Sequence, residues 1–130
     1  MQKPSYSISV RKIPTCPDVL ADTEPTLAVP DVAERLRVPV TRVHSMLQEG
    51  KLIAVNRDGF PQIPERFLND DEVNRFVPGV LAVLSDGGFS KDESLKWLFT
   101  EDESLPGRPV DALHGHLARE VMRRAQASAF

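Results

Sequence analysis

Two neighbouring segments near the start of the chain carry apolar residues at helical spacing. The first ends at a tight turn over residues 37–39, and the second runs from Val40 to Glu49. Pro30 suits the first turn of the first helix, because an N–H group at that position has no helical partner to lose. The predicted core-facing positions of the two helices are Val32, Ala33, Leu36, Val40, Val43, Met46 and Leu47.

A β-hairpin is predicted directly after these two helices. Apolar runs at residues 51–55 and 60–63 flank the polar stretch from Asn56 to Gly59. Apolar runs on either side of an Asp-Gly pair favour a hairpin, because these two residue types accept the backbone angles of a tight turn. Two short helices joined by a short turn and followed by a hairpin are the order of a winged helix-turn-helix.

Prolines shape the expected surroundings of this motif. Residues 1–25 contain four prolines, and no helical period survives their spacing. We therefore expect a flexible arm over residues 1–25, with a short extended piece at residues 8–10. Residues 26–29 are apolar and suit a strand beside the hairpin. Pro61 and Pro64 predict that the return strand of the hairpin lies at a sheet edge.

The expected arm carries two features with chemical potential. Its serine and threonine hydroxyls can accept a phosphate group, although an arm with no role is the simpler interpretation. Cys16 is the one cysteine of the chain, which excludes an internal disulfide framework and indicates an ordinary free thiol.

The chain from residue 67 onward is predicted to be helical. One helix is expected over residues 67–86, capped at residue 69 or 70 and kinked or split at Pro78. The glycines at positions 87 and 88 end it. Ser90 and Glu93 have the spacing of a capping box and open a short helix.

A polar loop over residues 100–107 separates that helix from the last one. The last helix is expected to begin at Pro109 or Val110, and Arg119 and Arg123 lie opposite its core face. Arg123 and Arg124 suit the C-terminal end of a helix dipole, which is a simpler interpretation than a basic binding patch. The core-facing positions are Leu113, Leu117, Val121 and Ala125.

The charge distribution gives only weak support for nucleic-acid binding. The 130-residue chain has a net charge of −3, which argues against a strongly basic coat. Residues 26–66 carry a net charge of +1, whereas residues 67–130 carry −4. The winged segment is thus the least acidic of the predicted folded parts.

The outer face of the second helix carries residue types that can read DNA. Thr41, Ser45 and Gln48 point directly away from the core face, and Arg42 and His44 flank them. Arginine pairs with guanine, glutamine pairs with adenine, and hydroxyl groups bind phosphates or bases. Any surface helix is polar on its outside, so the place of this helix in the motif is what favours the functional interpretation.

Two further basic residues lie near that face. Lys51 follows the helix, and Arg57 lies at the expected hairpin tip, where it is placed to meet a phosphate or the minor groove. The candidate DNA-binding residues are therefore Thr41, Arg42, His44, Ser45, Gln48, Lys51 and Arg57.

The sequence contains no constellation typical of an enzyme. It has no Gly-x-Ser-x-Gly motif, no glycine-rich phosphate loop and no Cys-x-x-Cys pair. His114 and His116 diverge on a helix and do not share a metal-binding face. His44 has no partner ligand one turn away. We therefore expect no enzymatic activity, no cofactor and no metal site.

The stretch VPDVAERLRVPVTRVHSMLQEGKLIAVNR resembles the excisionase/MerR-like group of winged helix-turn-helix domains. It departs from the group in two places. Arg37 stands where the group has a turn glycine, and Pro39 stands where the group has a Ser or Thr cap.

The resemblance extends into the second half of the chain. DGGFSKDESLKWLFTEDESL and the following GRPVDALHGHLAREVMRRAQA are similar to the C-terminal half of a small actinobacterial family. That family pairs a winged helix-turn-helix with a helical C-terminal domain. The resemblance implies a DNA-binding protein and a substrate of a Ser/Thr protein kinase. WLF and GRPVDAL are also similar to the partner-binding domain of Xre/ParS-type antitoxins.

The sequence thus predicts a mainly α fold, with a winged helix-turn-helix and small hairpin wing over residues 26–66 and a helical C-terminal domain over residues 67–130. We expect a DNA-binding transcriptional regulator that uses double-stranded DNA as its partner, and a homodimer or protein partner at the C-terminal helices. The alternative is a protein-interaction module, antitoxin-like or a signalling adaptor, that uses the C-terminal helices. No apolar run approaches the roughly 20 residues of a membrane span, and no signal peptide is recognisable, so we expect a cytoplasmic protein.

Overall fold

A four-stranded sheet lies at the centre of the fold, in a computed structural model that describes residues 13–130. The strand order is β1-β3-β4-β2. β3 and β4 form the hairpin, β2 pairs antiparallel with β4, and β1 pairs parallel with β3. The strands are β1 (Cys16–Pro17), β2 (Thr26–Ala28), β3 (Val55–Arg57) and β4 (Phe60–Pro64).

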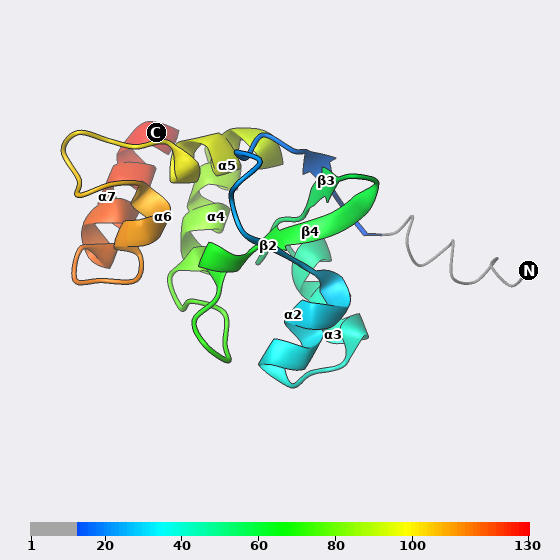
Figure 1. The fold of residues 1–130 in the computed structure, drawn as a ribbon. Helices are drawn as coiled ribbons and strands as arrows, with labels where there is room; N and C mark the ends of the chain where they lie inside the picture. Colours follow the sequence, from blue (N-terminus) through cyan, green and yellow to red (C-terminus); the bar gives the residue numbers. More distant parts are fainter. Residues whose placement is uncertain (1–12) are drawn as a thin grey trace, which may run out of the picture.

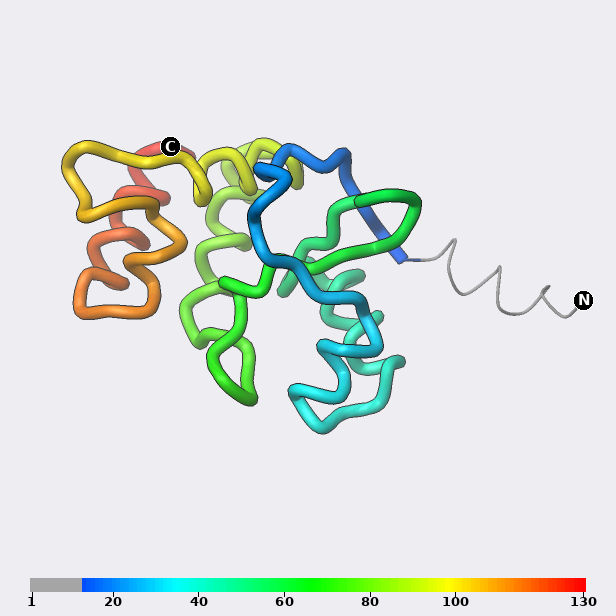
Figure 2. The backbone as a smooth tube through the Cα atoms, viewed as in Figure 1, coloured from blue at the N-terminus to red at the C-terminus, as the bar shows by residue number. Residues whose placement is uncertain are grey.

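Two helices lie on one side of the hairpin, and the remaining helices lie on the other (Figure 1). The first pair is α2 (Val29–Leu36) and α3 (Val40–Gln48). The backbone trace places α6 and α7 at one end of the molecule and the hairpin turn at the other (Figure 2). After the 3-10 helix η1 (Glu65–Phe67), the C-terminal helices are α4 (Val77–Asp86), α5 (Lys91–Phe99), α6 (Pro109–Ala112) and α7 (Ala118–Ala129).

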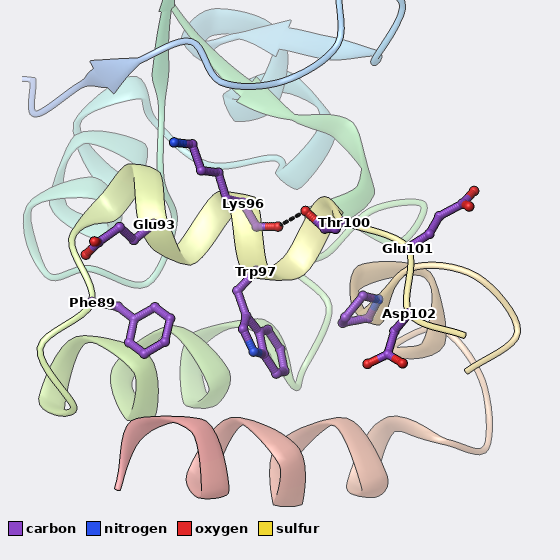
Figure 3. Close-up of a pocket in the computed structure, with 8 residues that line it drawn as sticks. Phe89, Glu93, Lys96, Trp97, Thr100, Glu101 and Asp102 are labelled. Atoms are coloured by element: carbon purple, nitrogen blue, oxygen red, sulfur yellow. Dashed lines mark hydrogen bonds between the residues drawn. The ribbon is translucent and has the colours of Figure 1, made fainter. Parts of the chain in front are cut away.

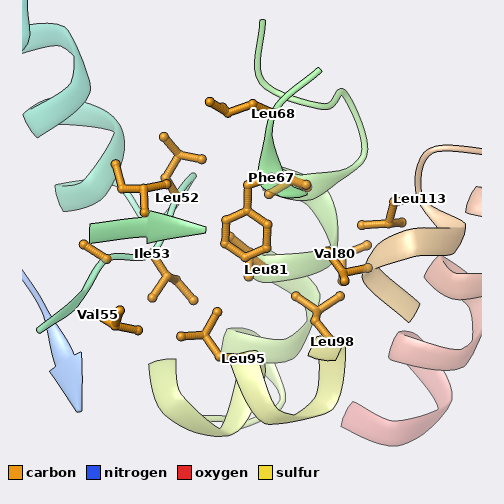
Figure 4. Close-up of a cluster of buried hydrophobic side chains, with 14 of the residues drawn as sticks. Leu52, Ile53, Val55, Phe67, Leu68, Val80, Leu81, Leu95, Leu98 and Leu113 are labelled. Atoms are coloured by element: carbon orange, nitrogen blue, oxygen red, sulfur yellow. The ribbon is translucent and has the colours of Figure 1, made fainter. Parts of the chain in front are cut away.

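One hydrophobic core joins the two halves of the chain. Phe67 is fully buried, and its ring lies between Leu52 and Ile53 on one side and the α4 and α5 side chains, such as Leu95, on the other (Figure 4). The ring of Phe67 also contacts that of Phe99, with the centroids 5.9 Å apart. The two predicted parts are therefore packed into a single unit at Phe67.

Several local predictions are confirmed. Residues 26–28 form β2 beside the hairpin. The side chain of Ser90 accepts a hydrogen bond from the Glu93 N–H while the Glu93 carboxylate accepts one from the Ser90 N–H, as a capping box requires. Gly87 ends α4. Val43 and Leu47 are buried in the core.

The prediction of a flexible arm is wrong for residues 13–25. Cys16 and Leu20 are buried, and the Cys16 N–H donates to the Ala54 carbonyl over 3.0 Å. Pairing of β1 with β3 holds this segment in place, and no local sequence pattern predicts that pairing. The extended piece expected at residues 8–10 lies outside the described residues.

The edge position predicted for the return strand is also wrong, because β4 pairs with β3 on one side and β2 on the other. The sheet accommodates Pro61 because β2 pairs with β4 only from Gln62 to Pro64. The nitrogen of Pro61 therefore has no carbonyl of β2 to pair with.

The helix expected over residues 67–86 is shorter than predicted and begins at Val77. Pro78 lies in its first turn and does not kink it. The preceding segment is held by Asn74, which is 3% exposed. Its side-chain oxygen accepts from the Phe76 N–H over 2.9 Å, and its amide donates to the Leu113 carbonyl over 3.1 Å.

The last helix is split into α6 and α7, which corrects the prediction of one continuous element. The break contains Gly115, and glycine disfavours a helix by about 1 kcal/mol relative to alanine. His114 also points back toward η1, with its Nε2 atom 2.7 Å from the Arg66 carbonyl oxygen. The inward position predicted for Val40 is also wrong, because this residue begins α3 and is 38% exposed.

Candidate nucleic-acid interface

The turn between α2 and α3 is closed by a Schellman motif. Arg37 is left-handed at φ 59°, its N–H donates to the Glu34 carbonyl, and the N–H of Val38 donates to the Ala33 carbonyl. Glycine usually occupies this position because a Cβ atom crowds the left-handed backbone. The departure from the usual residue at Arg37 therefore leaves the turn intact and adds a charged side chain next to α3.

The outward face of α3 gathers most of the predicted site. Thr41, Arg42 and Gln48 are exposed, and His44 and Ser45 are half-buried. The Ser45 hydroxyl donates to the Thr41 carbonyl over 3.1 Å, so its oxygen lone pairs remain available as acceptors. One helix of nine residues therefore presents a donor-rich guanidinium, an amide and two hydroxyls on one surface.

The electrostatics of this face favour an anionic partner. Arg37 and Arg42 are exposed and form no ion pair within residues 13–130. α3 contains no acidic residue in its first turn, and its N-cap Pro39 supplies no side-chain cap. The positive end of the helix dipole is therefore not neutralised locally. Lys51 forms an exposed pair with Glu49 at 3.2 Å, which solvent screens.

The hairpin closes in a tight two-residue turn. Asp58 and Gly59 have φ angles of 56° and 85°, and Arg57 pairs directly with Phe60. Positive φ at both central residues defines a type I′ turn, whose twist matches that of the strands. The side chain of Phe60 is 65% exposed at this tip.

Arg57 is engaged within the fold, although the sequence placed it at the tip for contact with DNA. Its Nε donates to the Asp18 carboxylate over 2.6 Å, and further N–H groups donate to the carbonyls of Glu24 and Ala21. The hydrogen bond from Arg57 lowers the pKa of Asp18 below its ordinary value. Three carboxylates, of Asp18, Asp22 and Asp58, also act on the guanidinium and raise the pKa of Arg57. The tip is consequently not a basic surface.

The structure thus brings together the predicted residues on α3 and separates Arg57 from them by its engagement with the N-terminal segment. Arg37, which the sequence interpretation considered only as a turn residue, is an exposed cation directly before α3. The sign that points to it is a charged residue where a glycine would be easier, directly before the second helix of the motif.

The histidines and acidic side chains of the described residues do not gather into a metal site. No group of three or more metal-ligating side chains occurs within residues 13–130. His114 and His116 lie in the exposed break between α6 and α7. None of the helices in the described residues is long and apolar enough to span a bilayer.

Comparison with known proteins decides the relationship. Residues 12–68 match the family described as "DNA-binding protein Rv2175c, wHTH domain", and residues 74–129 match the "Rv2175c C-terminal domain of unknown function". This chain belongs to the Rv2175c family. The boundary of the winged domain at residue 12 agrees with the pairing of β1 to β3.

The sequence and a solved structure that carry the name Rv2175c both resemble the chain over most of its length. The "DNA-binding protein Rv2175c" of Mycobacterium tuberculosis (strain ATCC 25618 / H37Rv) is 48% identical over 134 residues, which cover 93% of this chain and 92% of that protein. An "NMR structure of Rv2175c" superimposes with a TM-score of 0.83 at 47% identity, covering 94% of this chain and 92% of that one. The resemblance to an actinobacterial family with a winged helix-turn-helix and a helical C-terminal domain is confirmed.

Proposed function

We propose that this chain binds double-stranded DNA through α3 and acts in transcriptional regulation. The observation that carries the proposal is the outward face of α3, where Arg42 is exposed and free of ion pairs within residues 13–130. This helix is the second of a winged helix-turn-helix, the element that enters the major groove in such motifs. The printed name of the M. tuberculosis relative supports the same activity.

Each side chain of the face has a role that its chemistry suits. Arg42 is placed to bind guanine or a phosphate, and Gln48 to bind adenine. Thr41, His44 and Ser45 offer hydroxyl and imidazole groups to phosphates or base edges. Lys51 and Arg37 contact the phosphate backbone on either side of the helix, so Arg37 joins the residues that the sequence nominated.

The hairpin has a different role in this proposal. Arg57 is a positioning residue that ties the hairpin to Asp18, and a phosphate would have to displace that carboxylate to reach it. Contact of the wing with DNA then comes from the stretch between Asn56 and Gly59 through its backbone and the exposed Asn56 side chain.

The decisive experiment compares two exposed arginines. Arg42→Ala removes a cation from α3, and Arg119→Ala removes one from α7; neither residue has an ion pair within residues 13–130. Fluorescence anisotropy with a labelled mixed-sequence duplex, over a range of salt concentrations, measures both. We expect Arg42→Ala to weaken binding about tenfold and to reduce the salt slope by about 1, while Arg119→Ala stays close to the unmodified protein.

Equal losses in the two variants would contradict a specific site on α3 and leave only general charge attraction. No binding of the unmodified protein at low salt would reject DNA binding itself. The alternative function, a protein-interaction module, would then be tested with the full chain.

Three finer parts of the proposal have their own tests. Readout of base edges by α3 predicts a preferred DNA sequence, which selection from random sequence would recover. A dimer through the C-terminal helices predicts a doubled mass in sedimentation equilibrium. Phosphorylation by a Ser/Thr kinase predicts a mass increase of the full chain after incubation with such a kinase and ATP.

A further inference from the structure

An open groove lies in the C-terminal half, away from α3. Its volume is about 420 Å³, and its walls come from the turn before α5, α5 itself, the loop that follows α5, and the start of α6. The apolar part consists of Phe89, Trp97 and Pro109. Figure 3 shows the rings of Phe89 and Trp97 side by side, with both pointing away from the α5 axis into the space near α7.

The aromatic floor of the groove is held in place before any partner arrives. The indole N–H of Trp97 donates to the Ser128 hydroxyl over 3.2 Å, which fixes the ring against the end of α7. Phe89 follows the glycine turn at residues 87–88, and its N–H donates to the Leu84 carbonyl over 3.0 Å. Both side chains are half-buried. Rigid aromatic rings lose little entropy on binding and are enriched among the residues that dominate protein interfaces.

The rim of the groove is acidic. Glu93, Glu101 and Asp102 contribute three carboxylates against the single ammonium group of Lys96. Glu101 is exposed and has no ion pair within residues 13–130, and Asp102 lies 3.5 Å from one Arg124 nitrogen. Hydrogen bonds from Ser104 keep the pKa of Asp102 below its ordinary value, so this carboxylate is ionised at neutral pH.

We propose that this groove docks a cationic, apolar-anchored segment of a partner protein. The chemistry of the site matches such a segment, because arginine stacks on aromatic rings and pairs with carboxylates. The same carboxylates repel phosphates, so DNA does not fit here. The groove therefore gives the C-terminal half a binding role that is separate from α3.

The chain contains its own reporter for this site, since Trp97 is its single tryptophan. The probes are two synthetic peptides with the same leucine positions, one with arginine at every polar position and one with glutamate. We expect the arginine peptide to shift the Trp97 emission of the full chain to saturation and to bind more weakly at high salt. The glutamate peptide should cause no shift.

A matched pair of charge reversals tests the rim. Glu101→Lys removes a carboxylate of the groove, whereas Glu103→Lys changes an exposed carboxylate of the same loop that does not line it. We expect Glu101→Lys to weaken binding of the arginine peptide at least fivefold and Glu103→Lys to weaken its binding less than twofold. DNA binding in both variants should match the unmodified protein, which separates this result from the test of α3.

Other outcomes would overturn the proposal. Equal shifts with both peptides, no shift with either, or equal losses in the two variants would reject recognition of a cationic segment. A change in Trp97 emission with protein concentration alone would assign the groove to a second copy of the chain. A peptide response that appears only after residues 1–12 are deleted would overturn the proposal in another way, because it would assign the groove to those residues.

Discussion

α3 and α7 both carry arginines, but within residues 13–130 two of those on α7 are paired with a carboxylate and that of α3 is not. On α3, Arg42 is exposed and lacks an ion pair within the described residues, and the first turn has no acidic residue. On α7, Arg123 and Arg124 both bind Glu120, over 2.6 and 2.8 Å. Glu120 precedes these arginines by three and four residues, which places all three on neighbouring positions of one helix face.

This difference shows that a count of basic residues does not locate a nucleic-acid surface. The hydrogen bonds from Arg123 and Arg124 lower the pKa of Glu120 to about 2, so this carboxylate stays ionised and paired with both arginines at any ordinary pH. Arg42 has no such carboxylate one turn away. A chain with a net charge of −3 can therefore still present an unpaired cation at one helix, because the acidic excess lies elsewhere.

The largest expected effect comes from Arg108, a cation that is wholly engaged in the fold. Its Nη1 donates to the Glu24 carboxylate over 2.5 Å, and two further nitrogens donate to Asp111. Arg108→Gln would leave the Glu24 side chain, which is 9% exposed, without its counter-charge. We expect unfolding in urea to be easier by about 2–4 kcal/mol, with DNA affinity unchanged under native conditions. A variant with native stability would show that the ion pairs of Arg108 do not stabilise the fold.

A smaller effect is expected from acid. The hydrogen bond from Arg108 lowers the pKa of Asp111, and the one from Arg57 lowers that of Asp18. Each carboxylate therefore stabilises the fold above its ordinary pKa of 3.8 and loses that contribution as the pH falls through the lowered value. Since solvent screens both pairs, we expect about 1 kcal/mol or less from each.

Urea unfolding as a function of pH measures this contribution. Asp111→Asn should lower the free energy of unfolding at pH 7 and flatten its decline below pH 4, whereas Arg42→Ala should leave the profile unchanged. A profile that keeps its slope in Asp111→Asn would assign the acid sensitivity to other carboxylates.

Arg37 offers a change whose two effects have opposite signs. Arg37→Gly relieves the left-handed backbone at φ 59° and should raise stability by about 0.5 kcal/mol. The same change removes a cation beside α3 and should weaken DNA binding severalfold. Arg37→Ala separates the two effects, because alanine loses the charge but keeps the Cβ atom. Stronger DNA binding by Arg37→Gly would remove Arg37 from the interface.

The smallest effect is expected at Arg123, whose side chain is 68% exposed. Arg123→Gln breaks a surface pair with Glu120 and should leave the midpoint of urea unfolding essentially unchanged, because solvent screens the pair and Arg124 still binds that carboxylate. DNA affinity should also stay the same. A measurable loss of DNA affinity would show that α7 contributes to the interface after all.

The parts of the fold that the sequence predicts correctly are those with local chemistry. The hairpin follows from Asp58-Gly59, the start of α5 follows from the capping box at Ser90, and the end of α4 follows from Gly87. Each is determined within a few residues. The same holds for the outward face of α3, which follows from helical spacing alone.

The features that the sequence could not predict depend on partners far along the chain. Arg57 binds a carboxylate 39 residues away, and β1 pairs with a strand whose sequence gives no sign of a parallel neighbour. The start of α4 is delayed by Asn74, whose amide binds a carbonyl 39 residues away. The pattern of residues in a short stretch of sequence contains no information about such distant pairs. The ion pair between Arg57 and Asp18 could therefore not be predicted from the sequence.

Cys16 makes the attachment of the N-terminal segment measurable. It is the single thiol of the chain, it is buried in β1, and burial, followed by the charge of Asp92, raises its pKa to about 11. A thiol in this state reacts only after β1 leaves β3, because alkylation requires an exposed thiolate. The labelling rate of Cys16 by a maleimide under native conditions therefore reports the free energy of local opening at this strand. Comparison with the free energy of global unfolding would show whether the N-terminal segment detaches as a separate cooperative unit.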